Sequence, residues 1–478
     1  MKHYPQVLVP AAIVALGFLQ GCCTVGPDYD EPKTATPAQW SAPMAGGETN
    51  LAPSLAGWWK SFNDPQLDSL IERAEKTNHD LRIAGARVRE ARAFHDIAAS
   101  KLGPTLDAGG TYARQNQSKN QPVLGDLPMP PGVHFENNVY QVGFDASWEI
   151  DVFGGKRRTV EAGNAEVGAV EFGRRNVLVT LLGEVARNYV ELRGCQRRLE
   201  IANKNLKTQE EALAIAEDRF KNGLTSDMDV QQATALLANT RSVVPLLETG
   251  IQASIHRLGV LLGQPPGALL AELSQPAPIP AAPPQVPAGL PSDLLRRRPD
   301  IQQAERKLAA ATALIGVATA DLFPKFSLTG LAGFESTSAS DWFKGDSKFW
   351  SLGPTVQWRI FDAGRIRANI RVQNARQEQA LAVYEETVLL SFEEVENSLV
   401  AYAKEQIRRR SIEDAVEASQ NSLRMANQLY SSGLASFINV LDAERALYQA
   451  EDALVQSDKA VTQNLIGLYK ALGGGWET

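Results

Sequence analysis

The sequence contains few of the residues from which metal sites and disulfide frameworks are built. It has three cysteines, five histidines and five methionines in 478 residues, and neither the cysteines nor the histidines occur at the spacing of metal ligands. The formal net charge of −7 gives no basic surface for nucleic acid. No nucleotide-binding loop, nucleophile constellation or metal triad occurs either. We therefore expect no metal, no cofactor, no nucleic-acid partner and no enzymatic activity.

Long apolar runs are also scarce. After the first twenty residues no run is apolar for long enough to form a membrane helix. The N-terminus has a short basic end and then an apolar run from about Val7 to Leu19, which is typical of a secretory signal peptide. We therefore predict that residues 1–21 are a signal peptide.

Residues 19–22, Leu-Gln-Gly-Cys, resemble the lipobox of bacterial lipoproteins. In a lipobox the cysteine thiol receives a diacylglycerol, so Cys22 is the predicted lipid attachment site for acyl chains such as palmitate. Each buried methylene contributes about 0.8 kcal/mol, so several chains would tether the protein without a spanning helix. The next residue is Cys23, not the aspartate that commonly retains such lipoproteins in the inner membrane. The alternative is ordinary cleavage that leaves a free thiol.

The chain contains an internal duplication. Residues 81–110 match residues 301–330 at a constant shift of 220 positions. Farther along, the shift is 210 positions and pairs the Gly-Leu dipeptide 223–224 with 433–434. The polar, breaker-rich segment 115–134 accounts for the difference. We therefore predict two tandem repeats and exclude a short-period solenoid.

The duplication gives the predicted organisation of the chain. The segments are a signal peptide (1–21), an N-terminal lipid-anchored equatorial segment (22–66), repeat 1 (67–274), a Pro/Ala linker (275–291), repeat 2 (292–473) and a C-terminal tail (474–478).

Each repeat contains two strand patterns. The stretch from Tyr140 to Asp151 has apolar residues at every even position and polar residues or glycine at every odd position, so a strand there is apolar on one face and polar on the other. By the same pattern we predict four strands, at about 105–114, 140–151, 326–334 and 350–360.

The helices are predicted to be unusually long. No proline interrupts residues 155–222, so one helix of about 67 residues would extend roughly 100 Å. The neighbouring segments 78–102 and 226–263 have about 25 and 38 residues, and together they nearly equal the long helix. We therefore expect two shorter helices stacked end to end beside each long helix. Ordinary amphipathic core helices are the alternative, but these average about 11 or 12 residues.

A half-apolar strand fits either a sandwich or a membrane barrel with a polar lumen. Tyr140 and Trp148 are eight residues apart, as are Trp350 and Trp358. Eight tilted residues climb roughly 20 Å, which approaches the separation of two interfacial aromatic girdles. We therefore predict a membrane barrel with these four residues in its girdles. Because four strands cannot close alone and open edges are costly in hydrocarbon, two, three or four copies of the chain should assemble.

Five motifs in order on this duplicated frame resemble the outer-membrane factors of tripartite efflux pumps, which are OprM- or TolC-like, and among them the NodT-type lipoprotein branch. The motifs are CTVGPDY (23–29), LLRRRPD (294–300), LFP (322–324), FDAGR (361–365) and VLDA (440–443). The likeness covers essentially the whole mature chain.

The resemblance implies a mixed fold, all-α plus a membrane β-barrel, as a TolC-like homotrimer. Four strands per chain would form a twelve-stranded outer-membrane barrel, continued by a long α-helical periplasmic tunnel. The implied location is the outer membrane, both lipid-anchored and barrel-inserted. The implied partners are a periplasmic adaptor (membrane fusion protein), an inner-membrane transporter of the RND type, and outer-membrane lipid. The implied function is a passive exit duct for drugs, including antibiotics, or other small molecules.

The resemblance places the functional residues at the periplasmic tip of the tunnel. The two Gly-Leu turns, Gly223-Leu224 and Gly433-Leu434, would contact the adaptor, and their glycines also fit helix C-caps. For the periplasmic gate, Asp229 and Tyr430 match an inter-helix link. Asp442 matches a member of an acidic ring, with Arg445 one turn along the helix and able to pair with it.

Two departures from the TolC pattern affect this gate. Asn439 stands where that pattern has a second acidic residue, and Ala435 where it has an arginine. The ring should therefore carry less charge. A solvated helix pair of Asp442 and Arg445 remains an alternative.

Two other classes of protein are alternatives. A periplasmic coiled-coil structural or adhesion lipoprotein would explain the helices and the anchor, but not four alternating strands at matching places. An enzyme could use Asp145, Glu149 and Asp151 as acid/base residues. Their common face suggests a lumen wall instead.

Overall fold

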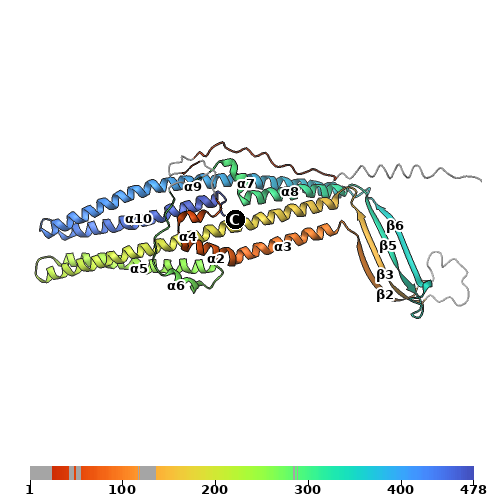
Figure 1. Ribbon diagram of the computed structural model, residues 1–478, viewed down its shortest axis with the longest axis horizontal. Helices are drawn as coiled ribbons and strands as arrows, with labels where there is room; N and C mark the ends of the chain where they lie inside the picture. Colours follow the sequence, from red (N-terminus) through yellow and green to blue (C-terminus); the bar gives the residue numbers. More distant parts are fainter. Residues whose placement is uncertain are drawn as a thin grey trace, which may run out of the picture. The chain divides into compact units, whose positions relative to one another are not determined.

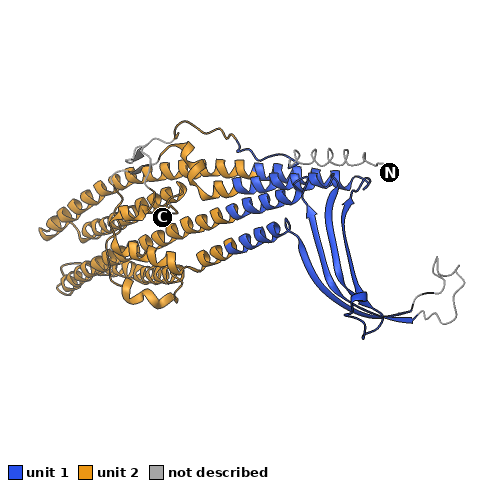
Figure 2. Ribbon diagram, turned by 45° about the vertical axis from the view of Figure 1, so that its right-hand side comes forward, with its two compact units in different colours: residues 1–32, 89–168, 305–382 blue, residues 33–88, 169–304, 383–478 orange. Residues whose placement is uncertain are grey.

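The computed structural model describes residues 24–41, 48–49, 55–116, 118, 136–283, 286–287 and 289–477. The predicted signal peptide and Cys22 lie outside these residues. The chain forms two compact units (Figure 2). Unit 1 comprises residues 1–32, 89–168 and 305–382, and unit 2 comprises residues 33–88, 169–304 and 383–478. Each unit takes segments from both halves of the chain, whereas each predicted repeat is one continuous segment. The two units are therefore not the two repeats.

Unit 1 contains an antiparallel sheet of four strands in the order β2-β3-β5-β6 (Figure 1). The strands are β2 (Thr105–Asn116), β3 (Glu136–Ile150), β5 (Lys325–Ser336) and β6 (Lys348–Gln357). Phe144 lies opposite Ala108 and Ala332, and Ala332 lies opposite Trp350. Since directly opposite residues share a face, the apolar positions of all four strands lie on one face. The two edges of the sheet are β2 and β6.

The long helices occur in pairs of equal length. They are α3 (His79–Ser100) and α8 (Pro299–Ala320) with 22 residues each, α4 (Gly155–Lys221) and α9 (Arg365–Ser431) with 67 each, and α5 (Asp227–Leu261) and α10 (Phe437–Ala471) with 35 each. The predicted bounds agree with these helices to within about two residues. Among the described residues, no helix is both long and apolar enough to cross a membrane.

The remaining elements in the described part of the chain are short. They are α2 (Pro65–Thr77), α6 (Leu270–Leu273), α7 (Leu294–Arg297), four 3-10 helices (Trp58–Phe62, Pro266–Leu269, Pro291–Asp293 and Gly345–Ser347), and β1 (Glu48–Thr49), which pairs in parallel with β4 (Val286–Pro287).

The predicted end of the last strand is wrong. The alternation continues to Ile360, but β6 begins at Lys348 and ends at Gln357. Trp358 therefore follows the strand, and its indole donates a hydrogen bond to the Leu322 carbonyl. Alternation reports which face a residue could take, whereas a strand also needs a partner for its backbone, and β5 begins only at Lys325, opposite Gln357.

A buried arginine joins three helices of unit 2 and accounts for the RPD part of the 294–300 motif. Arg298, which is 9% exposed, donates to the carboxylates of Asp300 and Glu394 and to the Ala471 carbonyl, each at 2.7 Å. The start of α8, the middle of α9 and the end of α10 are thus held by one side chain. Nearby, Trp58 stacks on Tyr469 with ring centroids 5.2 Å apart.

Ion pairs connect α4 with α10 in the same unit. Arg198 Nε lies 2.6 Å from Asp452 Oδ1, and Lys459 Nζ lies 2.9 Å from Glu191 Oε1. Burial raises the pKa of Glu191, but the hydrogen bond and the charge of Lys459 outweigh burial and lower it overall. These half-buried pairs favour one alignment of the two helices.

Candidate functional site

The two Gly-Leu turns have the same local geometry. Gly223 and Gly433 have φ values of 70° and 73°, in the left-handed region that favours glycine. The amide of each following leucine donates to a carbonyl five residues back, from Leu224 to Arg219 at 2.8 Å and from Leu434 to Leu429 at 2.9 Å. Leu224 and Leu434 are 67% and 77% exposed. Each turn therefore reverses the chain sharply and leaves its leucine side chain exposed to solvent.

Behind the turns, one apolar cluster packs together α4, α5, α9 and α10. This tip cluster consists of Ala216, Ala233, Leu236, Phe437, Val440 and Leu441, with Tyr430 among the partly buried residues packed against it. Phe437 and Tyr430 have ring centroids 5.2 Å apart. The two helix hairpins of one chain are therefore joined by apolar packing near their ends, a contact that sequence periodicity did not reveal.

The four predicted gate residues lie near the Gly-Leu turns, on α5, α9 and α10. Asp229 accepts a short hydrogen bond from the Thr225 hydroxyl. The guanidinium of Arg219 lies over the Tyr430 ring, 4.7 Å from its centroid. The expected link between Asp229 and Tyr430 therefore stays a prediction.

The acidic-ring residue is paired on its own helix. Arg445 Nη1 lies 3.3 Å from Asp442 Oδ1, and both side chains are about half exposed. This is the one-turn pair that the sequence suggests. It is also what a solvated helix pair would show.

A buried carboxyl group lies one turn beyond the tip cluster on α10. Glu444 is 7% exposed, and in the described part of the chain its Oε2 has no hydrogen-bond partner. Burial raises the pKa of Glu444 from 4.5 to about 7. Sequence reasoning missed this residue because Glu444 stands near Asp442 and Arg445, and such a polar stretch predicts exposed side chains.

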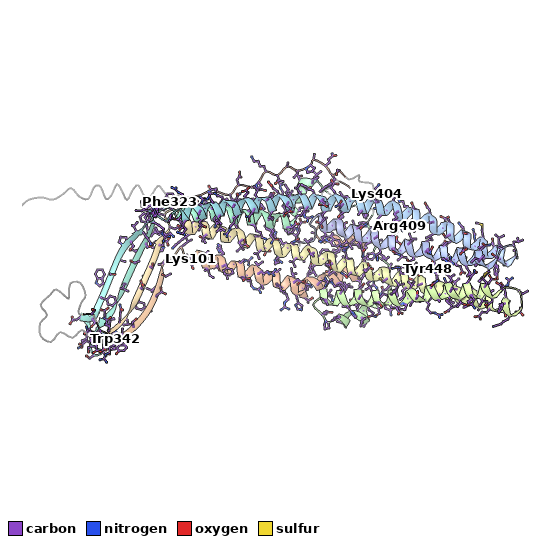
Figure 3. The ribbon with its side chains drawn as sticks, turned by 180° about the vertical axis from the view of Figure 1, so that it is seen from behind. Lys101, Phe323, Trp342, Lys404, Arg409 and Tyr448 are labelled. Carbon is purple, nitrogen blue, oxygen red and sulfur yellow. The ribbon has the colours of Figure 1, made fainter. Side chains whose placement is uncertain are left out.

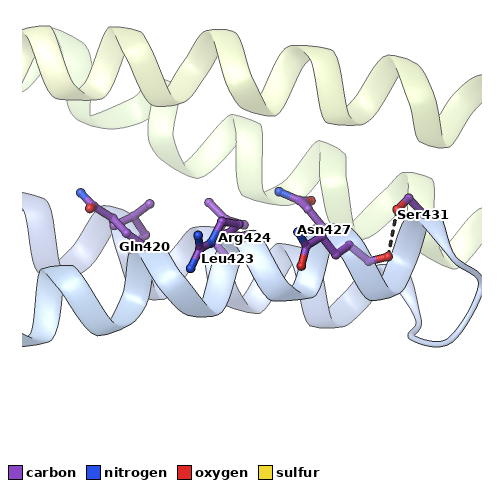
Figure 4. A pocket seen from close by; sticks show the side chains of 7 residues that line it. Gln420, Leu423, Arg424, Asn427 and Ser431 are labelled. Atoms are coloured by element: carbon purple, nitrogen blue, oxygen red, sulfur yellow. Dashed lines mark hydrogen bonds between the residues drawn. The ribbon is translucent and has the colours of Figure 1, made fainter.

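A cavity lies beside α9 near the turn. Its volume is about 560 Å³, and it is lined by Gln420, Leu423, Arg424, Asn427, Gln428, Ser431 and Leu447; Figure 4 shows most of these side chains along one helix. The lining therefore combines three side-chain amides, one guanidinium, one hydroxyl and two leucines.

The four predicted girdle residues lie in unit 1. Trp350 is 79% exposed, and the Tyr140 ring packs on Tyr112 and Trp342, with centroids 4.9 and 5.4 Å apart. Figure 3 shows Trp342 at the end of the strands far from the helices, and Phe323 at the helix end. Trp148 and Trp358 act at the helix end, where their indoles donate to the carbonyls of Leu102 and Leu322 at 2.8 and 3.1 Å.

One residue of the predicted acidic lumen wall has a structural role. Asp151 accepts hydrogen bonds from the backbone amides of Lys156 and Arg157, at 3.2 and 2.8 Å, and so caps the start of α4. Asp145 lies directly opposite Asp107, on the polar face of the sheet. Glu149, four residues farther along β3, lies on the same face as Asp107 and Asp145.

Sequence reasoning also missed a buried arginine that holds the N-terminal segment. Arg158, 2% exposed, bonds to Asp28 at 2.6 Å, to Glu161 at 2.8 Å and to the Val25 carbonyl at 3.2 Å. Gly26 has φ 89°, and a Cβ there would lie 2.4 Å from the Cα of Gly316. We call Arg158 with residues 24–28 the N-terminal clamp. The VGPD letters of the first motif are the signal that could have indicated it.

The geometry defines a class of protein. A four-stranded sheet with one apolar face and two open edges, together with long helical hairpins that end in glycine turns, is the fold of TolC-like outer-membrane channels. The solved structure of the outer-membrane channel OprN matches this chain with a TM-score of 0.87 and 39% identity over 95% of this chain and 100% of that one.

Two sequence relatives agree. The pyoverdine export outer membrane protein OpmQ of Pseudomonas aeruginosa is 34% identical over 98% of this chain and 97% of its own length. The solvent efflux pump outer membrane protein SrpC of Pseudomonas putida is 34% identical over 97% of both. The profile of the family described as outer membrane efflux protein matches residues 70–264 and 290–474. The chain belongs to this family and is an outer-membrane efflux channel.

Proposed function

We propose that three copies of this chain form one duct, with twelve strands in the outer membrane and a helical tunnel in the periplasm. The observation that carries the proposal is the sheet order, because it leaves β2 and β6 as open edges. Each unpaired backbone group in hydrocarbon costs several kcal/mol, and four strands are too few to close. Pairing β6 of one copy with β2 of the next gives a head-to-tail contact that can close as a ring.

The tandem repeat and its segment bounds are part of this proposal. In its support, the family profile matches two segments of similar length, and the helices of the two halves have equal lengths. Each copy would contribute two similar repeats, so a ring of three copies would contain six similar units. This near-sixfold arrangement suits a tunnel of twelve helices.

We further propose that Cys22 carries the acyl chains that anchor the duct to outer-membrane lipid. The lipobox supports this, as does the N-terminal clamp, which holds the segment that begins two residues after Cys22. Replacement of Cys22 by serine should remove the lipid mass from the purified protein.

The proposed partners are a periplasmic adaptor at the two Gly-Leu turns and an inner-membrane transporter of the RND type, which supplies the energy. The exposed Leu224 and Leu434 support the docking site. Relatives named for pyoverdine export and solvent efflux support small-molecule cargo, and the antibiotic class belongs to the same proposal. The transporter selects among such compounds.

In the proposed gate, Asp229, Tyr430, Asp442 and Arg445 hold the tip closed until the adaptor separates the hairpins. Three Asp442 carboxylates around a threefold axis would repel one another and attract cations. The conductance of single channels in planar bilayers tests the gate. Asp442→Ala combined with Tyr430→Phe should raise the conductance, whereas Asp414→Ala, at an exposed site elsewhere on α9, should not.

Two results would contradict these proposals in different ways. An unchanged conductance of the double variant would remove these residues from the gate. A purified protein that stays monomeric in detergent would contradict the duct itself.

A further inference from the structure

A second cavity lies in unit 1 where β6 ends and α9 begins. Its volume is about 500 Å³, and we call it the base pocket; its lining is Asp321, Phe323, Lys325, Gln357, Trp358, Arg359, Ile360, Phe361, Arg365 and Ile366. Trp358, Ile360 and Phe361 are 57%, 84% and 86% exposed. Three adjacent large apolar side chains this bare indicate a contact surface.

Two of the three cations on the base pocket are available to an anion. Lys325 pairs with Asp321 at 3.0 Å. Among the described residues, Arg359 and Arg365 make no ion pair within 4 Å. The nearby Asp362 carboxylate accepts hydrogen bonds from the backbone amides of Gly364 and Ile366, at 3.0 and 2.7 Å, which hold it at the start of α9. Two guanidinium groups against this one carboxylate leave the rim with a net positive charge. The base pocket is therefore apolar on one side and cationic on the other.

The base pocket is continuous with the apolar face of the sheet and close to the N-terminal clamp. The Phe323 ring stacks on Phe153 with centroids 4.5 Å apart, and Phe153 lies 6.5 Å from Phe326 of β5. The Phe153 carbonyl accepts the amide of Val25 at 3.1 Å. Cys22 precedes Val25 by three residues in the sequence.

We propose that the base pocket binds an anionic phospholipid. One acyl chain would lie along Phe323, Trp358, Ile360 and Phe361, and the phosphate would be held by Arg359 and Arg365. Guanidinium groups match phosphate geometry with paired, charge-assisted hydrogen bonds. A phospholipid without net negative charge would leave the positive charge of the rim unbalanced. The inference rests on the proposed membrane duct and adds a lipid ligand to it.

The test uses the full-length, lipidated protein purified in detergent and stripped of bound phospholipid. Native mass spectrometry then counts bound lipid as phosphatidylglycerol or phosphatidylcholine with the same chains is added. We expect at least a tenfold preference for phosphatidylglycerol, saturating at one molecule per chain. Arg359→Gln with Arg365→Gln should abolish the preference. Trp358→Ala with Phe361→Ala should weaken the binding of both lipids.

The control removes two charges elsewhere. Arg87→Gln with Arg410→Gln changes exposed arginines on α3 and α9 outside the base pocket, and it should keep the preference. Inorganic phosphate at the same concentration should not displace phosphatidylglycerol, because it lacks the acyl chains.

Three outcomes would overturn the proposal. They are equal binding of the two lipids, an unchanged preference in the Arg359/Arg365 variant, and displacement by phosphate alone. A Phe361→Cys variant tests a second copy as the occupant: if its thiol is blocked to maleimide in the lipid-free assembly but reactive in the monomer, another copy covers the base pocket. Channel conductance of the same samples reports the duct separately, so a conducting assembly without lipid preference refutes only the lipid site.

Discussion

The indole of Trp148 donates a hydrogen bond to the carbonyl of Leu102, with 2.8 Å between Nε1 and the oxygen. This bond joins β3 to the turn that follows α3. The equivalent bond from Trp358 to the Leu322 carbonyl, at 3.1 Å, joins the segment after β6 to the turn that follows α8. A girdle tryptophan usually directs its N–H toward lipid headgroups and water. Here two of them fasten strand ends to helix ends.

Replacing Trp148 or Trp358 by phenylalanine tests this role. The variants keep an aromatic ring but lose the N–H donor, so each should lose about 1 kcal/mol of stability. For the measurement, samples are heated to a series of temperatures before electrophoresis. The gel then shows the temperature at which the folded form converts to the unfolded form. Trp350→Phe is the control, because Trp350 is 79% exposed and makes no hydrogen bond in the described residues. An equal effect of all three would assign the loss to the ring and not to the bond.

Removal of Arg158 tests the N-terminal clamp. Arg158→Leu deletes the donor that holds the Asp28 carboxylate and the Val25 carbonyl, so residues 24–41 should be cleaved at least tenfold faster by a protease. Arg158→Lys should be intermediate, since an ammonium cannot reach all partners at once. Arg197→Leu removes a half-exposed pair with Glu200 and should leave the cleavage rate unchanged.

The tip cluster should resist opening. Leu441 is 2% exposed, and Leu441→Ala should destabilise the packed ends of the hairpins by about 2–5 kcal/mol. Hydrogen exchange of the amides at the starts of α5 and α10 measures this locally. Leu434→Ala, at a 77% exposed turn residue, should leave exchange near the wild-type rate. Protection that falls equally in both would show that the cluster does not hold the hairpins together.

Glu444 should make the tip weaken as the pH rises. Burial raises its pKa in the folded state to about 7 from an ordinary 4.5. Below about pH 4.5 the group is neutral in both states, and stability is greatest. Between about pH 4.5 and pH 7 the carboxyl group is ionised mainly in the unfolded form. The free energy of unfolding therefore falls as the pH rises across this range, by up to about 3 kcal/mol, and levels off above about pH 7.

Exchange at the start of α10, corrected for the intrinsic effect of pH, measures this slope between pH 5 and 8. Glu444→Gln should remove most of it, because the amide does not titrate. Glu417→Gln, on the exposed side of α9, should retain it. A wild-type slope in Glu444→Gln would mean that another group is responsible.

Local patterns predicted the elements well. Alternation located all four strands, the absence of proline located the 67-residue helix α4, and the Gly-Leu turns located its end and the start of the helix that follows. These are properties of neighbouring residues, so a sequence displays them directly. The last strand was overextended to Ile360 because alternation continues where the backbone partner on β5 has ended.

Contacts between distant residues could not be predicted in the same way. Arg158 and Asp28 are 130 positions apart, and Glu444 is buried although it stands in a polar stretch of the sequence. Neither residue type carries a periodic signal, since a buried arginine or glutamate is recognised by its partners and its solvent exposure.

The sequence by itself determined which segments are strands and helices, where the chain reverses, and that one face of the sheet is apolar, because each depends on residues a few positions apart. The tertiary structure alone decided which carbonyls the tryptophans bind, which arginine holds the N-terminal segment and which carboxyl group loses water. Those outcomes depend on distances between segments far apart in the chain, and only the folded packing fixes such distances.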